Sequence, residues 1–195
     1  MNKKIILKGR RVVLRPLSLK DASRFCCWLN DPEVTFFLDI YDKPKTTLKM
    51  EKDWINKNKK NKNNLSFSID TSEGIHIGVV SLRDIQPLHK NAQFGIIIGD
   101  KKYWGQGYGT EAGKLIIDYG FKKLKLHRIW LGFYAYNIRG EKSYKKLGFK
   151  KESCLRDQIY RNGYYHNLIN MGILREEYLK NQKLKTLKPK PKGKN

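Results

Sequence analysis

The sequence has few cysteines, and they are not arranged for metal binding or cross-linking. Its 195 residues contain three, Cys26, Cys27 and Cys154, which show no zinc-ligand spacing and cannot all pair in disulfides. Cys26 and Cys27 fall in an expected helix, where free thiols usually pack as small apolar side chains. No histidine is placed to suggest activation of either thiol, so we favour packing over a reactive role and expect no metal.

Long apolar runs are also missing. No stretch approaches the roughly 20 apolar residues that a membrane-spanning helix needs. The opening segment MNKKIILKGRR holds an apolar run of only three residues, which is too short for the core of a secretory signal. We therefore expect a cytoplasmic protein with no membrane partner. Its apolar content of 39% suffices for one globular core.

Acidic residues are scarce relative to basic ones. Asp and Glu number 18 against 41 Lys and Arg, a formal net charge of +23. This balance fits a nucleic-acid-binding protein, but lysine greatly outnumbers arginine, the better bidentate phosphate ligand. Lysine also mixes with asparagine in NKNKKNKNN (56–64), as on a solvated surface. A non-catalytic RNA-associating protein is therefore kept as an alternative.

The basic segment KNQKLKTLKPKPKGKN (180–195) is almost free of apolar residues. Such a composition cannot bury enough surface to order a chain, so we expect disorder. The segment is either a solvated extension or a loose tether to an anionic partner such as RNA.

Periodic apolar residues divide the rest of the chain into strands and helices. Ala22, Phe25, Cys26 and Leu29 recur at helical spacing after a capping box formed by Ser18 and Asp21. The segment NDPEV (30–34) is expected to end this helix, because proline disfavours a helical residue before it. Further helices are expected at 47–60, with Trp54 and Ile55 inward, at 108–123, and at 138–147, closed by Gly148 in a left-handed conformation.

Alternating or continuous apolar runs predict the strands. They lie at 11–17, 65–70, 74–82, 92–100 and 127–136, with two more around Asn162-Gly163 as a hairpin. The run at 127–136 is apolar on both faces, as in the middle of a sheet. The order β-α-α-β-β-β-α-β-α-β-β indicates one α/β domain with a mixed sheet.

One glycine-rich stretch leads directly into the helix expected at 108–123. In YWGQGYGTEA (103–112), Gly105, Gly107 and Gly109 can turn successive N–H groups into one concavity. The start of the helix adds unpaired N–H groups and the positive end of its dipole, which together suit a pair of phosphates. The spacing matches neither a P-loop nor the dinucleotide fingerprint G-x-G-x-x-G. By itself the stretch is equally consistent with a structural turn.

A second motif follows the next strand. YAYNIRGEKSYKKLGF (134–149) contains Asn137, Gly140, Tyr144, Gly148 and Phe149. With the glycine stretch before it, the chain resembles the GNAT acetyltransferase superfamily over residues 8–178, and most closely its RimJ/RimL-like branch of N-terminal protein acetyltransferases. The glycine stretch departs from the family motif in one place, since Trp104 stands where Gln or Arg is usual.

The resemblance implies an α/β GNAT fold. Its mixed, mostly antiparallel, twisted sheet of about seven strands would be flanked by about four helices. The sheet would be splayed between its fourth and fifth strands, which are 92–100 and 127–136 here. A single domain would cover 1–178, and 179–195 would form the disordered tail.

The resemblance also implies a cofactor site for acetyl-CoA, without metal. Backbone amides of the glycine stretch would hold the diphosphate, the splayed strands 94–99 and 128–135 would flank the pantetheine, and Asn137 would hydrogen-bond it. The residues expected to bind the cofactor are Ile97, Ile98, Gln106, Gly107, Tyr108, Gly109, Thr110, Asn137, Gly140 and Ser143.

Tyr144 is the expected general acid that protonates the departing thiolate. A phenol of pKa about 10 can donate to a thiolate whose acid has a pKa of about 8.5. The alternative interpretation is a packed aromatic residue whose hydroxyl only caps another group. Its spacing from Asn137 favours catalysis.

The general base is not identified by the sequence. Many relatives carry a glutamate where this chain has Gln93. Candidates are Asp100, Glu33, Asp39 and His127, each of which can equally be a surface or capping residue.

The acceptor is expected to be a primary amine. An α-amine of pKa about 7.8 is more often uncharged at neutral pH than a lysine amine of pKa about 10.4, which favours an α-amine where no base is evident. The charge of +23 repels polyamines at long range. We therefore rank a protein N-terminus first, with association to ribosomal RNA possible, and a small-molecule amine second.

Two further features leave alternatives open. Tyr160, Tyr164 and Tyr165 either line the acceptor entrance or are simply strand-forming aromatic residues. The protein is expected to be a monomer or a homodimer.

Overall fold

A single twisted sheet organises the molecule. The computed structural model describes residues 5–40 and 44–187, and in these ranges the strands form one eight-stranded sheet in the order β1-β2-β3-β4-β5-β6-β8-β7. The neighbours pair antiparallel except β5 and β6, which are parallel. The strands are β1 (Leu7–Lys8), β2 (Val12–Pro16), β3 (Leu65–Thr71), β4 (His76–Gln86), β5 (Asn91–Ile98), β6 (Arg128–Tyr134), β7 (Lys150–Arg161) and β8 (Tyr164–Leu174). The predicted mixed sheet is confirmed, with one strand more than expected, because the two residues of β1 are too short to show a pattern.

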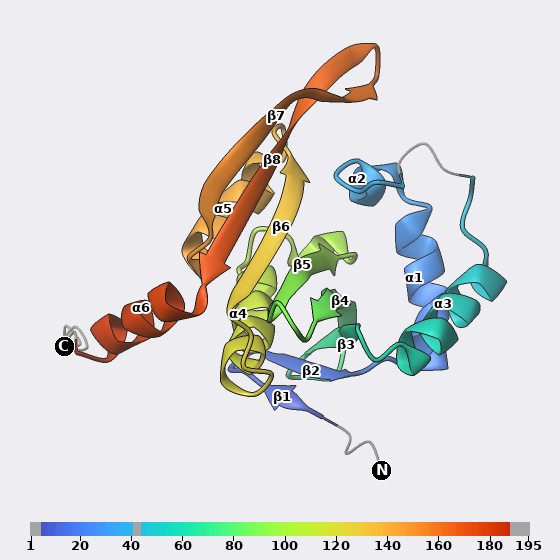
Figure 1. Ribbon diagram of the computed structural model, residues 1–195. Coiled ribbons are helices and arrows are strands. Elements are labelled where there is room, and N and C mark those ends of the chain that lie inside the picture. Colours follow the sequence, from blue (N-terminus) through green and yellow to red (C-terminus); the bar gives the residue numbers. More distant parts are fainter. Residues whose placement is uncertain (1–4, 41–43, 188–195) are drawn as a thin grey trace, which may run out of the picture.

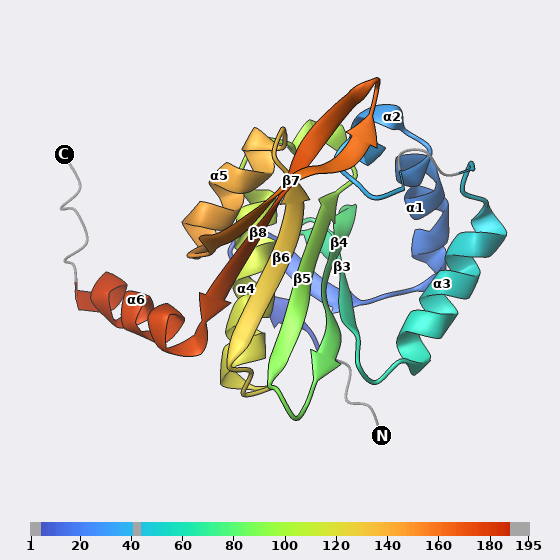
Figure 2. The ribbon, with the colours of Figure 1, turned by 45° about the horizontal axis from the view of Figure 1, so that its top comes forward.

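Helices cover both faces of the sheet. Figure 2 shows α1 and α3 side by side, away from α4 and α5. The helices are α1 (Ala22–Leu29), α2 (Pro32–Thr35), α3 (Leu48–Lys60), α4 (Tyr108–Lys122), α5 (Ile138–Leu147) and α6 (Arg175–Leu187). The sequence missed α2. Pro32 ends α1 as expected, but it is also the first residue of α2, with Asp31 as the cap. Proline is tolerated there because the N–H that it lacks would have no partner within the first helical turn.

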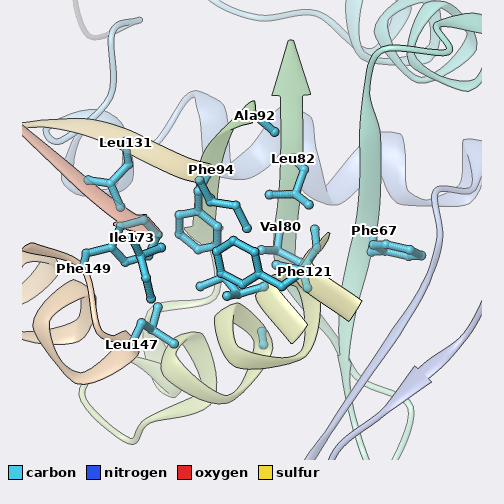
Figure 3. Packing of buried hydrophobic residues seen from close by; sticks show 14 of the residues in the cluster. Phe67, Val80, Leu82, Ala92, Phe94, Phe121, Leu131, Leu147, Phe149 and Ile173 are labelled. Carbon is cyan, nitrogen blue, oxygen red and sulfur yellow. The ribbon is translucent and has the colours of Figure 1, made fainter. Parts of the chain in front are cut away.

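The larger core lies between the sheet and the helices α4 and α5. Phe94 of β5, Phe121 of α4 and Phe149 beside α5 gather there (Figure 3). A Cβ on Gly113 would meet Leu147 at 2.8 Å, so glycine lets α4 approach α5 closely. Each large apolar side chain buried here contributes about 1.5–3 kcal/mol, and the two helices that carry the sequence motifs are thereby fixed on the sheet.

A largely buried ionic network joins the start of α1 to the strands β2, β3 and β4. Arg15 of β2 forms ion pairs with Asp21 at 2.8 Å and Asp70 at 2.6 Å. Asp21 also completes the predicted capping box with Ser18. His76 of β4 lies 3.3 Å from Asp21. The capping box therefore belongs to a wider set of contacts between helix and sheet.

The C-terminal segment differs from the expectation of disorder. α6 continues to Leu187 and projects from the end of β8 (Figures 1 and 2), so the domain boundary expected at 178 falls inside a helix. Lys, Leu and Gln are good helix formers, and the first proline of the segment is Pro189. Tyr178 is buried and donates a hydrogen bond to Asp118 at 2.9 Å. Residues 188–195, which complete the expected tail, lie outside the described residues.

Two smaller expectations on the helices are corrected. Cys27 is exposed and Cys26 is half-buried with its thiol 3.3 Å from the carbonyl of Thr46, so only Cys26 packs. Ile55 is fully buried, but Trp54 is 39% exposed, because neighbouring residues of a helix point about 100° apart. Among the described residues, no helix is long and apolar enough to cross a membrane.

Candidate active site

The sheet opens between β5 and β6. These parallel strands pair only at Asn91 with Arg128, Ala92 with Ile129 and Gln93 with Trp130. Beyond these residues they point apart (Figure 1), as the predicted splay requires. The facing edges, 94–98 and 131–134, have no strand between them, and such edges can pair with the amides of an extended ligand.

A cleft of about 1470 Å³ passes through this opening. Ile96, Ile97 and Ile98 line it from β5, and Leu131 and Phe133 line it from β6. At one end it reaches the glycine stretch and α5, and at the other end it reaches α1 and α3. The cleft therefore connects the expected cofactor side with a second side on the opposite face of the sheet.

The glycine stretch forms the amino end of α4. Gly107 has φ of +86° and is the N-cap of this helix, which has no side-chain cap. The first N–H groups of α4 are therefore left for a ligand. Trp104 donates its indole N–H to the carbonyl of Ile98 at 2.6 Å, and the Gln106 amide donates to Lys102 at 2.5 Å. These bonds anchor the stretch, and they turn the side chain of Gln106 toward Lys102 while its backbone N–H remains a donor for a diphosphate.

Three basic residues of α5 face the same end of the cleft. Arg139, Lys142 and Lys146 line it, at a spacing that places them on one face of the helix. The guanidinium of Arg139 lies 3.9 Å from the ring centre of Trp104, and burial lowers the pKa of Arg139. Sequence reasoning missed these residues, although their spacing after Asn137 was visible. Together with the uncapped helix they fit a ligand with several phosphates.

The motif residues between α4 and α5 hold each other in place. The Oδ1 of Asn137 accepts a hydrogen bond from the N–H of Gly140 at 2.9 Å and so caps α5. A Cβ on Gly140 would lie 2.7 Å from the Asn137 side chain. Thr110 and Ser143 share a hydrogen bond of 2.9 Å that ties α4 to α5. Asn137 keeps its amide N–H groups for pantetheine, and direct binding by these residues stays a prediction.

Tyr144 both packs and lines the cleft. Its ring contacts Phe133 at 5.4 Å and Phe94 at 6.3 Å between centres, while the residue also faces the cleft. Burial raises the pKa of Tyr144 to about 12, so the hydroxyl stays protonated at physiological pH. Among the described residues it has no hydrogen-bond partner, so the phenol is a neutral proton donor available to a ligand.

The second side of the cleft contains a buried carboxylate. Glu51 of α3 lines the cleft and is only 7% exposed, and burial raises its pKa. Phe25, Trp28 and Trp54 line the same part, and the rings of Phe25 and Trp54 meet edge to face at 5.7 Å. Sequence reasoning missed Glu51. The available signal was its position one helical turn before Ile55, on the inward side of α3.

The four candidate bases fall in different places. Asp39 lines the cleft and accepts a hydrogen bond from the Tyr134 hydroxyl at 3.4 Å. Glu33 is exposed and pairs with Lys101, Asp100 caps a short 3-10 helix, and His127 is exposed at the start of β6. Of the four, only Asp39 is among the residues described as lining the cleft.

The tyrosines of the hairpin lie elsewhere. Tyr160, Tyr164 and Tyr165 are exposed on β7 and β8 and do not belong to the described lining of the cleft. Tyr160 and Tyr165 contact each other at 5.0 Å, as cross-strand partners do. The structure favours the interpretation as strand-forming residues over an acceptor entrance.

Known proteins share this architecture. The sequence matches the acetyltransferase (GNAT) domain over residues 11–150. It is 32% identical over 184 residues to a spermidine N(1)-acetyltransferase of Escherichia coli, covering 88% of this chain and 90% of that protein. A putative ribosomal N-acetyltransferase, YdaF of Bacillus subtilis, is 29% identical over 106 residues, 54% of this chain and 57% of that protein. The crystal structure of spermidine N-acetyltransferase from Vibrio cholerae in complex with CoA and spermine aligns with a TM-score of 0.80 and 26% identity, over 88% of this chain and 99% of that chain.

The matches and the geometry agree on the chemistry. The uncapped end of α4, the basic face of α5 and the open edges of β5 and β6 suit a thioester with a diphosphate and an amide-bearing arm. The described residues include no group of three or more His, Cys, Asp or Glu placed to hold a metal ion. The chain belongs to the GNAT acetyltransferase family, and it is an acetyl-CoA-dependent N-acetyltransferase.

Proposed function

We propose that this enzyme acetylates the primary amine of a small molecule that binds between the sheet and the helices α1 and α3. The observation that carries this proposal is Glu51, a carboxylate 7% exposed that lines the cleft beside Trp28 and Trp54. A carboxylate and aromatic faces both attract an ammonium group. The similarity to proteins named as spermidine acetyltransferases supports a small amine.

A protein N-terminal α-amine, as in the RimJ/RimL-like branch, is the second candidate. The glutamate that many relatives carry is replaced by Gln93, and an α-amine needs less help to lose its proton. The partial similarity to a putative ribosomal N-acetyltransferase points the same way. The first candidate is preferred because Glu51 supplies a carboxylate that the sequence alone did not reveal.

The proposed reaction is a direct transfer. Acetyl-CoA supplies a thioester, whose carbonyl carbon the amine nitrogen attacks. The new C–N bond forms, the C–S bond breaks, and Tyr144 gives its phenolic proton to the sulfur. The proton lost by the amine passes to one of the two described carboxylates that line the cleft, Glu51 or Asp39. Asn137 and the edges of β5 and β6 hold the reactants in position, which supplies much of the rate.

An acceptor panel tests this proposal. Polyamines, amino acids, amino sugars and short peptides are supplied with acetyl-CoA, and thiol release is followed. We expect small amines to be acetylated, and Glu51→Gln to raise KM for the amine about 10-fold or more, since a hydrogen bond to a charged group contributes about 1.5–3 kcal/mol. The matched control is Glu73→Gln, an exposed glutamate in the turn between β3 and β4. Acetylation of peptides alone, or an unchanged KM in Glu51→Gln, would contradict the proposal.

A further inference from the structure

An arginine forms part of the acceptor side of the cleft. Arg83 of β4 lines the cleft and is the cross-strand partner of Gln93. A Cβ built on Gly95 would lie 3.1 Å from its Nη2 and 3.3 Å from the hydroxyl of Ser81. The guanidinium therefore lies over Gly95, on the floor of the cleft.

This guanidinium has no anionic partner among the described residues. Other arginines of the sheet are paired, Arg15 with Asp21 and Asp70 and Arg128 with Glu152. Arg83 keeps contact with solvent in the open cleft, yet the surrounding protein desolvates it enough to lower its pKa. An unpaired, partly desolvated guanidinium is a preformed site for a carboxylate or a phosphate.

The register of β4 and β5 places Arg83 where the opening between β5 and β6 begins. Three cross-strand pairs form the floor in order, Val79 with Ile97, Ser81 with Gly95, and Arg83 with Gln93. The opening toward β6 begins directly after Gln93. Gly95 has no side chain, and the guanidinium of Arg83 fills the space that a side chain there would need.

Glu51 and Arg83 lie toward opposite ends of the acceptor side. Val79 packs against the cluster of α1 and α3 that contains Ile55, and Glu51 lies one turn before Ile55 in α3. At the other end Asn64 lines the cleft beside Arg83 and accepts a hydrogen bond from Asp84 at 3.1 Å. An acceptor that lies between these two ends would therefore have the carboxylate on one side and the guanidinium on the other.

We propose that the acceptor carries an acidic group, a carboxylate or a phosphate, close to its amine, and that Arg83 binds this group. The inference rests on the proposed function and specifies its substrate class. A polyamine with further ammonium groups would place like charge beside Arg83, whereas an amino acid or a phosphorylated amino sugar would complement both ends. Arg83 is then a specificity-determining residue of this chain.

Matched pairs of acceptors test the role of Arg83. Each pair has the same amine with and without the acidic group, such as an amino acid with its amide and an amino sugar 6-phosphate with its parent sugar. We expect the wild-type enzyme to favour the acidic member at least about 10-fold in kcat/KM, as a charge-assisted hydrogen bond provides. Arg83→Gln should bring that ratio close to one, and Arg83→Lys, which keeps the charge but not the fork, should give an intermediate ratio.

The control is Arg156→Gln, which removes an exposed arginine of β7 outside the described lining of the cleft and should keep the wild-type ratio. Melting temperatures of all variants check that they are folded. A wild-type preference for spermidine, or a ratio that Arg83→Gln does not change, would overturn the role of Arg83 while leaving a small-amine acetyltransferase intact. Failure of every small amine, with thermal stabilisation by CoA retained, would overturn both proposals.

Discussion

At the scale of single residues, the packing of Tyr144 determines the protonation state of its hydroxyl. Its ring is held by Phe133 and Phe94, and burial raises its pKa to about 12. A phenol with this pKa does not ionise below about pH 10, so it remains a proton donor at physiological pH. The same burial that fixes the ring therefore keeps the proton in place.

Tyr144→Phe tests the proposed acid. Removing the hydroxyl should lower kcat about 10²-fold, because a positioned general acid raises the rate by about 10²- to 10⁴-fold. The affinity for acetyl-CoA should stay close to that of the wild type. Steady-state kinetics and calorimetric titration with CoA provide the two measurements. Tyr119→Phe, in α4 and outside the described lining of the cleft, is the control. Equal kcat in the two variants would assign Tyr144 to packing alone.

Gly107 permits a comparison of conformation with binding. It has φ of +86°, and a Cβ there would lie 3.2 Å from the Nη2 of Arg11. Gly74, in the turn before β4, has φ of +84° with nothing within 4 Å of a Cβ. Alanine at either position should cost about 1–2 kcal/mol of stability, because both adopt a left-handed backbone.

Only Gly107→Ala should also weaken CoA binding, by about 10-fold or more, since the shifted backbone would displace the N–H groups that we expect to hold the diphosphate. Urea denaturation and calorimetric titration of CoA separate the two effects. Equal CoA affinity in Gly107→Ala and Gly74→Ala would place the diphosphate away from the amino end of α4.

The motif residues can be picked out from the sequence, whereas Glu51 and Arg83 cannot, for a physical reason. Gly107, Asn137 and Tyr144 lie within short segments whose spacing is set by local backbone geometry. Glu51 and Arg83 line the same cleft only because α3 packs over β4. Nothing in their local sequence distinguishes them from the many other charged residues of this chain.

At the scale of elements, the network around Arg15 fixes α1 to the sheet. It links β2, β3 and β4 through Arg15, Asp70 and His76 to Asp21 at the start of α1. Burial lowers the pKa of His76. Burial also opposes ionisation of Asp21, but hydrogen bonds from Arg15, Ser68 and Ser18 outweigh it and keep the pKa of Asp21 below its usual value.

Both shifts predict that stability falls as the pH falls. The unfolded chain binds a proton at His76 with a pKa of about 6.5 and at Asp21 with a pKa of about 3.9, more tightly than the folded protein does. The contribution of these two groups to the free energy of unfolding should therefore be fully present at pH 7, decline below about pH 6.5, and decline further below about pH 4. Urea titrations across this range measure it.

His76→Gln should remove the upper part of this decline and keep the lower part. The control His89→Gln replaces an exposed histidine and should follow the wild type. Parallel curves for wild type and His76→Gln would show that His76 does not couple protonation to folding.

Most elements were predictable because their apolar periodicity is strong. The bounds of α4, α5 and β3 follow the expected ranges closely. α2 and β1 were missed because each is too short to show a period, and the helix after residue 178 was missed because its charged residues suggested disorder. The order of strands, with β8 inside β7, requires tertiary pairing that local patterns do not specify.

At the scale of the whole molecule, where the net charge is +23, the charged residues are distributed unevenly along the cleft. The cofactor end of the cleft is lined by Arg139, Lys142 and Lys146, which complements phosphates. The acceptor end holds Glu51 and Asp39 with Arg83. Association with RNA through the surplus of lysine stays a prediction, which binding of generic RNA with a steep dependence on salt would test.

The decisive experiment is a crystal structure of the enzyme with CoA. We expect the diphosphate to lie on the N–H groups of residues 106–110, within hydrogen-bond distance of the amino end of α4, and the pantetheine to run between β5 and β6 toward Tyr144. A complex in which the diphosphate lies elsewhere, or in which the pantetheine leaves the opening between β5 and β6 empty, would contradict this expectation.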